Sequence, residues 1–258
     1  MFLHGFMGSG EQFLHLIPHL QKSVNPVTLE ITCAPGNGLD ASTYTSDAAV
    51  FDVETLCEGL QHVIQIHLHQ RSFVLGYSMG GRLALSWAVR YPDQPLGLIF
   101  ESSTAGIVDA AERKQRMHQD KKQAKAILRD YPAFLKEWEQ NSLFASPSSA
   151  LNPASLNTRV KKLAAIHQSR DPKLMARWLT DFGTGVMPSV WDRIDRLKCP
   201  VLLITGSRDQ KFCSLAQRIK THLPNARHEI VSHAAHRVHI DAPDAYLEHV
   251  SSFLSNIS

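Results

Sequence analysis

The feature that most constrains the fold of this 258-residue chain is the pentapeptide Gly76-Tyr77-Ser78-Met79-Gly80. It follows a short apolar run at 72–75 and precedes a stretch of small and apolar residues with helical spacing. A serine between two glycines in this context is typical of a sharp strand–turn–helix elbow, because the serine backbone takes an unusual angle and larger side chains would clash. The alternative is a glycine-rich turn with a surface serine. We predict the elbow, with Ser78 held at a helix N-terminus that favours negative charge.

Apolar runs alternate with helical stripes along most of the chain, which predicts a mostly parallel sheet with helices on both faces. Strands are expected at 1–3, 27–31, 72–75, 96–100, 201–205 and 228–231. Helices are expected at 11–20, 52–69, from 79 onward, 215–222 and 242–254.

The segment at about 106–191 interrupts this rhythm, since it has helical periodicity and several prolines but no convincing strand. We interpret it as a helical lid inserted into a core formed by 1–105 and 192–258. The whole chain, 1–258, is thus expected to be one domain. Its 43% hydrophobic content is ample for one large core.

A serine hydroxyl is a weak nucleophile or base unless a histidine accepts its proton. The chain has 14 histidines, so the choice needs an argument. In the α/β-hydrolase fold the order along the chain is serine, acid, histidine, with the acid after a late strand and the histidine after the last one. Asp209 and His236 occupy these places, with His233 and His239 as rivals and a solvated loop aspartate as the alternative for Asp209. Asp209 would fix the tautomer of His236.

Two backbone amides are candidates for stabilising an oxyanion. One belongs to Met79, directly after the serine. The other belongs to Phe6, in the loop His4-Gly5-Phe6 after the first apolar strand. That loop could also be only a tight turn.

The composition excludes several other classes of function. A formal net charge of +3, with Lys and Arg spread along the chain, argues against nucleic-acid binding. The basic cluster at 113–125 is more typical of a solvated helix face. Four cysteines without metal-ligand spacing suggest a reduced, cytoplasmic protein with no metal site. No apolar run is long enough for a membrane span, and the N-terminus lacks the features of a signal peptide.

Several longer strings resemble the 2-succinyl-6-hydroxy-2,4-cyclohexadiene-1-carboxylate synthase (MenH) family of menaquinone or phylloquinone biosynthesis, which has the α/β-hydrolase fold. They span nearly the whole chain and lie at 3–10, 76–85, 101–103, 112–116 with Asp120, 182–185, 188–191, 206–212 and 235–239. The resemblance implies a lyase that eliminates pyruvate from 2-succinyl-5-enolpyruvyl-6-hydroxy-3-cyclohexene-1-carboxylate without a cofactor. Ser78 would be the base in this reaction.

The resemblance also implies a small substrate with several carboxylates, for which arginine is the favoured partner. Candidate substrate-binding residues are Arg82, Arg113 and Arg116, together with Tyr77 and Trp138 as either pocket walls or core residues. No pattern in the sequence sets the oligomeric state.

The chain departs from the family pattern in three places. It begins almost at the His-Gly strand, so either the strands that usually precede it are missing or the start of the sequence is truncated. The Leu-Pro-Gly-His-Gly loop of the family reads Ala34-Pro35-Gly36-Asn37-Gly38, without its histidine. His167, with Arg170 close behind, stands where an arginine is expected.

Two alternatives stay open on the sequence alone. One is a serine hydrolase acting on a small ester or a carbon–carbon bond, which would favour an apolar pocket. The other is a non-catalytic small-molecule receptor that kept the fold. An arginine-rich pocket under the lid would favour the lyase.

Overall fold

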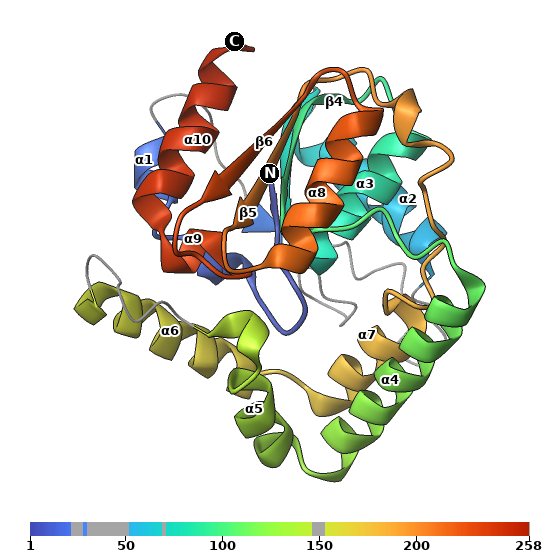
Figure 1. Ribbon diagram of the computed structural model, residues 1–258, viewed down its shortest axis with the longest axis vertical. Helices are drawn as coiled ribbons and strands as arrows, with labels where there is room; N and C mark the ends of the chain where they lie inside the picture. Colours follow the sequence, from blue (N-terminus) through green and yellow to red (C-terminus); the bar gives the residue numbers. More distant parts are fainter. Residues whose placement is uncertain (22–27, 30–51, 69–70, 146–152, 258) are drawn as a thin grey trace.

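The computed structural model describes residues 1–21, 28–29, 52–68, 71–145 and 153–257. Within them, six strands form one sheet in the order β2-β1-β3-β4-β5-β6, and every pairing is parallel (Figure 1). The strands are β1 (Phe2–Leu3), β2 (Thr28–Leu29), β3 (Ser72–Tyr77), β4 (Pro95–Glu101), β5 (Val201–Gly206) and β6 (Ala226–Val231). The predicted parallel α/β sheet is confirmed.

The predicted strands match these positions closely. Of the run predicted at 27–31, Thr28–Leu29 forms β2, while residues 27, 30 and 31 lie outside the described residues. The loop at 34–38, whose sequence differs from the family pattern, also lies outside the described residues. Strands β4 and β6 begin one and two residues earlier than predicted, because strand ends carry weaker apolar signals than strand centres.

The two faces of the sheet are covered by different helices, because alternate side chains of a strand point to opposite sides. On one face, Leu202 and Ile204 pack with apolar residues of the terminal helix, such as Tyr246. On the other, Val201 and Leu203 belong to a cluster with apolar residues of other core helices, such as Leu83 and Ile219. Figure 1 shows α1 (Ile17–Leu20) and α10 (Pro243–Ser255) on the first side, and α2 (Val53–Val63), α3 (Met79–Arg90) and α8 (Gln210–His222) on the second.

Some helices differ from the sequence prediction for local reasons. The helix expected at 11–20 is a 3-10 turn, η1 (Gly10–Phe13), followed by α1, because Pro18 fits only in the first turn of a new helix. The helix expected at 52–69 ends at Val63 and continues as one π turn, η3 (Ile64–Leu68). Helix α8 starts five residues earlier than predicted, since Asp209 caps it. Short helix α9 (Val238–Asp241) was not predicted.

Between β4 and β5 the chain forms a set of helices beyond the carboxyl edge of the sheet (Figure 1). Asp109, Asp130 and Asp171 cap three of them through backbone amides. The described part of 106–191 contains no strand, and η5 (Ile194–Arg196) leads back to the sheet. The helices are α4 (Ala110–Arg129), α5 (Tyr131–Glu139), η4 (Ser142–Phe144), α6 (Pro153–Gln168) and α7 (Pro172–Phe182).

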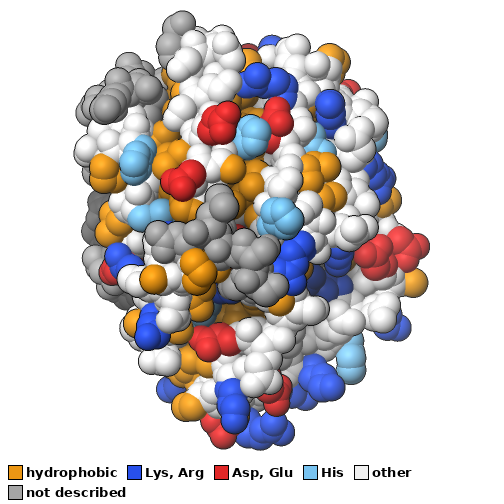
Figure 2. Space-filling model, turned by 60° about the vertical axis from the view of Figure 1, so that its left-hand side comes forward, with side chains coloured by type: hydrophobic (Ala, Val, Ile, Leu, Met, Phe, Trp, Pro, Cys, Tyr) orange, Lys and Arg blue, Asp and Glu red, His pale blue; other side chains and the backbone are white. Residues whose placement is uncertain are grey.

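The surface in Figure 2 carries basic and acidic side chains interspersed with one another, so neither sign dominates this face. None of the helices in the described ranges combines the length and apolar character that a membrane-spanning helix requires.

Candidate active site

Ser78 lies at the elbow between β3 and α3, as the motif predicts. Its backbone has φ 49° and ψ −108°, a conformation that costs about 1–3 kcal/mol and persists only where the surroundings impose it. The amide of Ser78 donates to the carbonyl of Glu101 at 2.9 Å, and the Ser103 hydroxyl donates to the carbonyl of Ser78 at 2.9 Å. Strand β4 therefore holds the elbow in place.

The glycines around the serine are required by close backbone contacts. A Cβ at Gly76 would lie 2.5 Å from the Cα of Gly81. A Cβ at Gly80 would lie 2.3 Å from the carbonyl oxygen of Leu3 in β1. Any larger residue would push α3 away from the sheet, so the glycines let the helix start directly behind Ser78.

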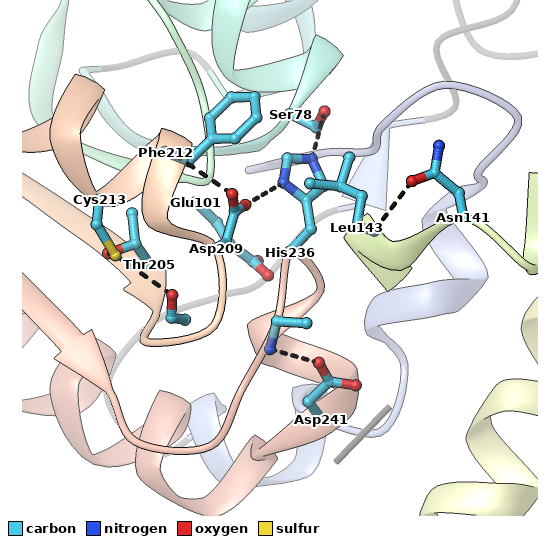
Figure 3. A network of polar contacts seen from close by, with 12 residues as sticks. Ser78, Glu101, Asn141, Leu143, Thr205, Asp209, Phe212, Cys213, His236 and Asp241 are labelled. Atoms are coloured by element: carbon cyan, nitrogen blue, oxygen red, sulfur yellow. Dashed lines mark hydrogen bonds and ion pairs between the residues drawn. The ribbon is translucent and has the colours of Figure 1, made fainter. Parts of the chain in front are cut away.

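The structure brings Ser78, His236 and Asp209 into one hydrogen-bonded array (Figure 3). His236 Nε2 lies 3.1 Å from Ser78 Oγ, and His236 Nδ1 lies 2.6 Å from Asp209 Oδ2. Asp209 and His236 are buried, and the other oxygen of Asp209 accepts from the Phe212 amide at 3.3 Å. The arrangement can draw the proton from Ser78 onto an imidazole whose tautomer is set by a carboxylate.

The two rival histidines have other surroundings. His239 is fully buried, and its Nδ1 donates to Glu101 Oε1 at 2.7 Å. His233 is exposed and takes a left-handed backbone conformation, with φ 64°. The histidine beside Ser78 is thus the one that sequence order selected.

A cavity of about 260 Å³ opens on the Ser78 hydroxyl. Its lining comes from helices α4, α5 and α7 and from the elbow and the loop after β1. Its lining residues include Phe6, Tyr77, Ser78, Met79, Arg82, Thr104, Arg116, Gln119, Asp120, Gln123, Trp138, Asn141, Leu143, Phe144, Trp178, Thr184, Lys211, Phe212 and His236.

Both candidate oxyanion amides lie at this cavity, since Phe6 and Met79 line it. Met79 is the first residue of α3, so its N–H has no acceptor within the helix. Phe6 is the second residue of a turn closed by the Gly8 amide and the Gly5 carbonyl at 3.0 Å, which leaves the Phe6 amide outside the turn bond. Gly5 permits this approach, since a Cβ there would lie 2.6 Å from the Tyr77 ring.

Two of the three predicted arginines reach the cavity. Arg82 donates to the Phe182 carbonyl at 3.2 Å and lies over the Phe182 ring. Burial lowers the pKa of Arg82 to about 9, with the positive charge of Arg116 adding to the effect, so the guanidinium stays protonated at neutral pH. Arg116 Nε lies 2.8 Å from Asp120 Oδ1, in an ion pair whose carboxylate is buried.

Arg113 does not line this cavity, contrary to the sequence expectation. Its side chain donates to the carbonyls of Gly185 and Val186, each at 3.4 Å. The reason is helical geometry. Residues three apart on α4 point in directions that differ by about 60° around the helix axis. Arg116 therefore points into the cavity, whereas Arg113 points toward the neighbouring segment. Arg113 therefore ties α4 to the turn after α7.

The two predicted aromatic residues both line the cavity. Tyr77 is largely buried and its ring contacts those of His236 and His239, with centroids 5.5 and 4.9 Å away. Burial raises the pKa of Tyr77 well above its ordinary value, so the phenol stays neutral. Trp138 packs on Phe6 and Phe144, with ring centroids 5.5 and 5.2 Å apart.

Sequence reasoning assigned no site role to several polar residues of the cavity, among them Asp120, Lys211 and Thr184. Asp120 follows Arg116 at helical spacing, so an i,i+4 ion pair could have been predicted. Lys211 comes two residues after Asp209, and Thr184 lies between Gly183 and Gly185. Neither position in the sequence indicates that the side chain would point into the cavity. Across the described ranges, no cluster of three or more His, Cys, Asp or Glu side chains could hold a metal ion.

The model of the alpha/beta hydrolase fold family matches residues 1–243. Together with the parallel sheet, the elbow and the Ser78–His236–Asp209 array, this match shows that the chain belongs to the α/β-hydrolase fold family.

Similar proteins of known name show to which family within the α/β-hydrolase fold the chain belongs. A protein of Bacillus subtilis (strain 168), named provisionally as a 2-succinyl-6-hydroxy-2,4-cyclohexadiene-1-carboxylate synthase, is 37% identical over 99% of this chain and 89% of its own length. The synthase of that name from Pectobacterium atrosepticum is 29% identical over 98% of this chain and 92% of its length. A solved structure of MenH from S. aureus has a TM-score of 0.85 and 27% identity, and covers 99% of this chain and 92% of that one. The chain belongs to this synthase (MenH) family, a family of lyases on the α/β-hydrolase fold.

Proposed function

We propose that this enzyme converts 2-succinyl-5-enolpyruvyl-6-hydroxy-3-cyclohexene-1-carboxylate into 2-succinyl-6-hydroxy-2,4-cyclohexadiene-1-carboxylate and pyruvate, a step of menaquinone biosynthesis. The observation that carries the proposal is that the serine array and two arginines, Arg82 and Arg116, share one cavity. Family membership supports the same reaction.

In the proposed reaction, Ser78 is a base and forms no acyl-enzyme. His236 Nε2 takes the hydroxyl proton, and the serine oxygen removes the ring proton next to the succinyl ketone. The electron pair moves through the ring double bond as the C–O bond to the enolpyruvyl group breaks. The leaving enolate takes up a proton, which the His236 imidazolium returns directly or through water, and becomes pyruvate. No cofactor takes part in these steps.

The charge that develops is negative, and the site offers donors where it would form. Proton removal next to the ketone makes an enolate oxygen, which the amides of Phe6 and Met79 would bind. Asp209 would stabilise the imidazolium of His236 at the same moment. The substrate carboxylates would pair with Arg82 and Arg116, and Arg116 is already aligned by Asp120.

We further propose that the helices between β4 and β5 act as a lid on a single domain. They supply Arg116 from α4, Trp138 from α5 and Trp178 from α7 to the cavity wall. Such a lid would exclude water and strengthen the charge interactions beneath it.

A serine hydrolase acting on a small ester or a carbon–carbon bond is the second candidate. The observation in its favour is the apolar part of the cavity wall, formed by Trp138, Leu143, Phe144 and Phe212. The same Ser78 would then attack a carbonyl carbon, with the same amides holding the tetrahedral oxyanion.

The decisive experiment offers the purified full chain the cyclohexene substrate and, separately, an activated ester. We expect release of pyruvate together with the absorbance of the conjugated diene, and loss of both in Ser78→Ala. Ser214→Ala, which changes an exposed serine on α8, is the matched control and should keep full activity. Rapid ester turnover without pyruvate would establish the hydrolase instead. Tight ligand binding without any turnover would establish a receptor.

A further inference from the structure

A second cavity, of about 180 Å³, adjoins the active site. Val160, Ala164 and His167 of α6 form one wall at helical spacing, and Arg237 and Phe144 face them. Phe144 lines both cavities, so its ring is part of the partition between them. The mechanism proposed above makes no use of this second cavity.

Two buried nitrogen atoms in this wall lack a hydrogen-bond partner among the described residues, namely His167 Nδ1 and Arg237 Nε. The two side chains are only 4% and 8% exposed. Arg237 uses another nitrogen to donate to the Phe144 carbonyl at 3.0 Å, and its guanidinium lies over the Phe144 ring. Buried polar nitrogens left without a partner are rare in native proteins, and such groups commonly mark a place for a bound ion or water.

Two arginines, Arg237 and Arg170, place positive charge near His167. Burial and the charges of Arg237 and Arg170 lower the pKa of His167 to about 4, so the imidazole is neutral at pH 7. Among the described lining residues, the only carboxylate is that of Glu139, an exposed residue at the end of α5. Asp241 feels the charge of Arg237 but its carboxylate accepts from the Ala235 amide.

We propose that this cavity is a binding site for a small carboxylate anion, held by the guanidinium of Arg237 and the imidazole of His167. Guanidinium and imidazole N–H groups are matched to the two oxygens of a carboxylate. A volume of about 180 Å³ corresponds to about six water-sized groups, enough for a two- or three-carbon acid and too little for a ring with several carboxylates.

The site is joined to the active site by direct contacts. Arg237 follows His236 in the chain, and the Phe144 ring meets the His236 ring edge to face, with centroids 5.9 Å apart. The His236 amide also donates to the carbonyl of Leu143, beside Phe144, at 3.3 Å. A bound anion would therefore restrain Arg237 and Phe144, and through them the position of His236.

Isothermal titration calorimetry of the full chain with sodium acetate and with sodium pyruvate, at constant chloride, tests the proposal. Pyruvate is the acid that the proposed function releases, whereas acetate makes the test independent of that function. We expect one saturable site per chain, present also in Ser78→Ala. Arg237→Gln should weaken binding by about tenfold or more, because it removes a charged donor. Ala164→Leu, which fills the cavity from α6, should abolish binding.

Two control variants separate this site from the other cations. Arg90→Gln changes an exposed arginine paired with Glu54 and Glu58, and should bind acetate like the wild type. Arg82→Gln should also retain binding. Binding lost in Arg82→Gln but kept in Arg237→Gln would place the anion in the main cavity and overturn the proposal. Absence of saturable heat, or a wild-type affinity in Ala164→Leu, would overturn it as well, even if Arg237→Gln failed to fold.

Discussion

At the scale of single residues, the carboxylate of Asp209 has a fixed partner for each oxygen. One oxygen accepts from His236 Nδ1 and the other from the Phe212 amide, which makes Asp209 both the acid of the array and the N-cap of α8. A residue with two such bonds holds the imidazole more rigidly than a free side chain would.

Replacing Asp209 by asparagine should keep the fold but lower kcat for pyruvate release by about 10²–10⁴-fold. The amide removes the charge that stabilises the imidazolium, and it favours the wrong tautomer of His236. Steady-state kinetics with circular dichroism would check both points. Asp93→Asn, which changes an exposed partner of Lys198, is the matched control. A kcat within twofold of the wild type would contradict the role of Asp209.

The arginines allow a comparison within one helix. Arg116→Gln should raise KM for the polycarboxylate substrate by about tenfold or more, since it removes a charged donor from the cavity. Arg113→Gln should leave KM nearly unchanged, because the Arg113 side chain does not line the cavity and donates to the carbonyls of Gly185 and Val186. Equal effects of the two changes on KM would show that the lid rearranges on binding.

At the scale of elements, the contact between α3 and β1 depends on the absence of side chains. Helix α3 starts so close to the sheet that the position of Gly80 is in van der Waals contact with the β1 backbone. This contact places the Ser78 hydroxyl beside the loop that carries Phe6. The relative position of the elbow and the candidate oxyanion amides therefore depends on the close approach of α3 to β1 at Gly80.

Gly80→Ala should destabilise the protein by about 1–3 kcal/mol and reduce activity, because backbone atoms of Leu3 cannot move aside. Gly59→Ala, in the middle of α2, should instead be neutral or stabilising by about 0.5–1 kcal/mol. Urea denaturation of both variants measures the difference. Equal unfolding free energies would show that α3 has room to shift.

At the scale of the whole molecule, two histidines couple folding to pH, of which His167 is buried and His15 is partly buried. Burial is the main cause that lowers the pKa values of His15 and His167 to about 4, below their ordinary value of 6.5. The unfolded chain thus binds more protons than the folded one between pH 4 and 6.5. The stabilisation is complete above pH 6.5 and is lost as the pH falls toward 4.

We therefore expect the unfolding free energy in carboxylate-free buffer to fall between pH 7 and 4, by on the order of 1–3 kcal/mol for each histidine. His167→Gln should flatten this dependence, whereas His19→Gln, at an exposed position on α1, should not. Urea denaturation at several pH values provides the measurement. A slope unchanged in His167→Gln would mean that other groups carry the pH dependence.

Much of the fold could be predicted because its signals are local. Apolar runs marked the strands, and spacing marked most helices. The prediction was less accurate where a neighbouring segment decides, as for α9, whose His239 is held by the buried carboxylate of Glu101 in β4. The side chain of Arg113 also points away from the cavity because it bonds to the turn after α7, a contact that the sequence does not indicate.

The sequence by itself determined the elbow, the alternation of strands and helices, and the order of Ser78, Asp209 and His236, because glycine sterics and apolar periodicity act over a few residues. The tertiary structure brings this histidine to Ser78, a contact between residues 158 positions apart. Only the tertiary structure decided that Arg82 and Arg116, but not Arg113, line the main cavity, and that Arg237 and His167 line a second cavity. These outcomes depend on how distant segments pack, which no local pattern encodes.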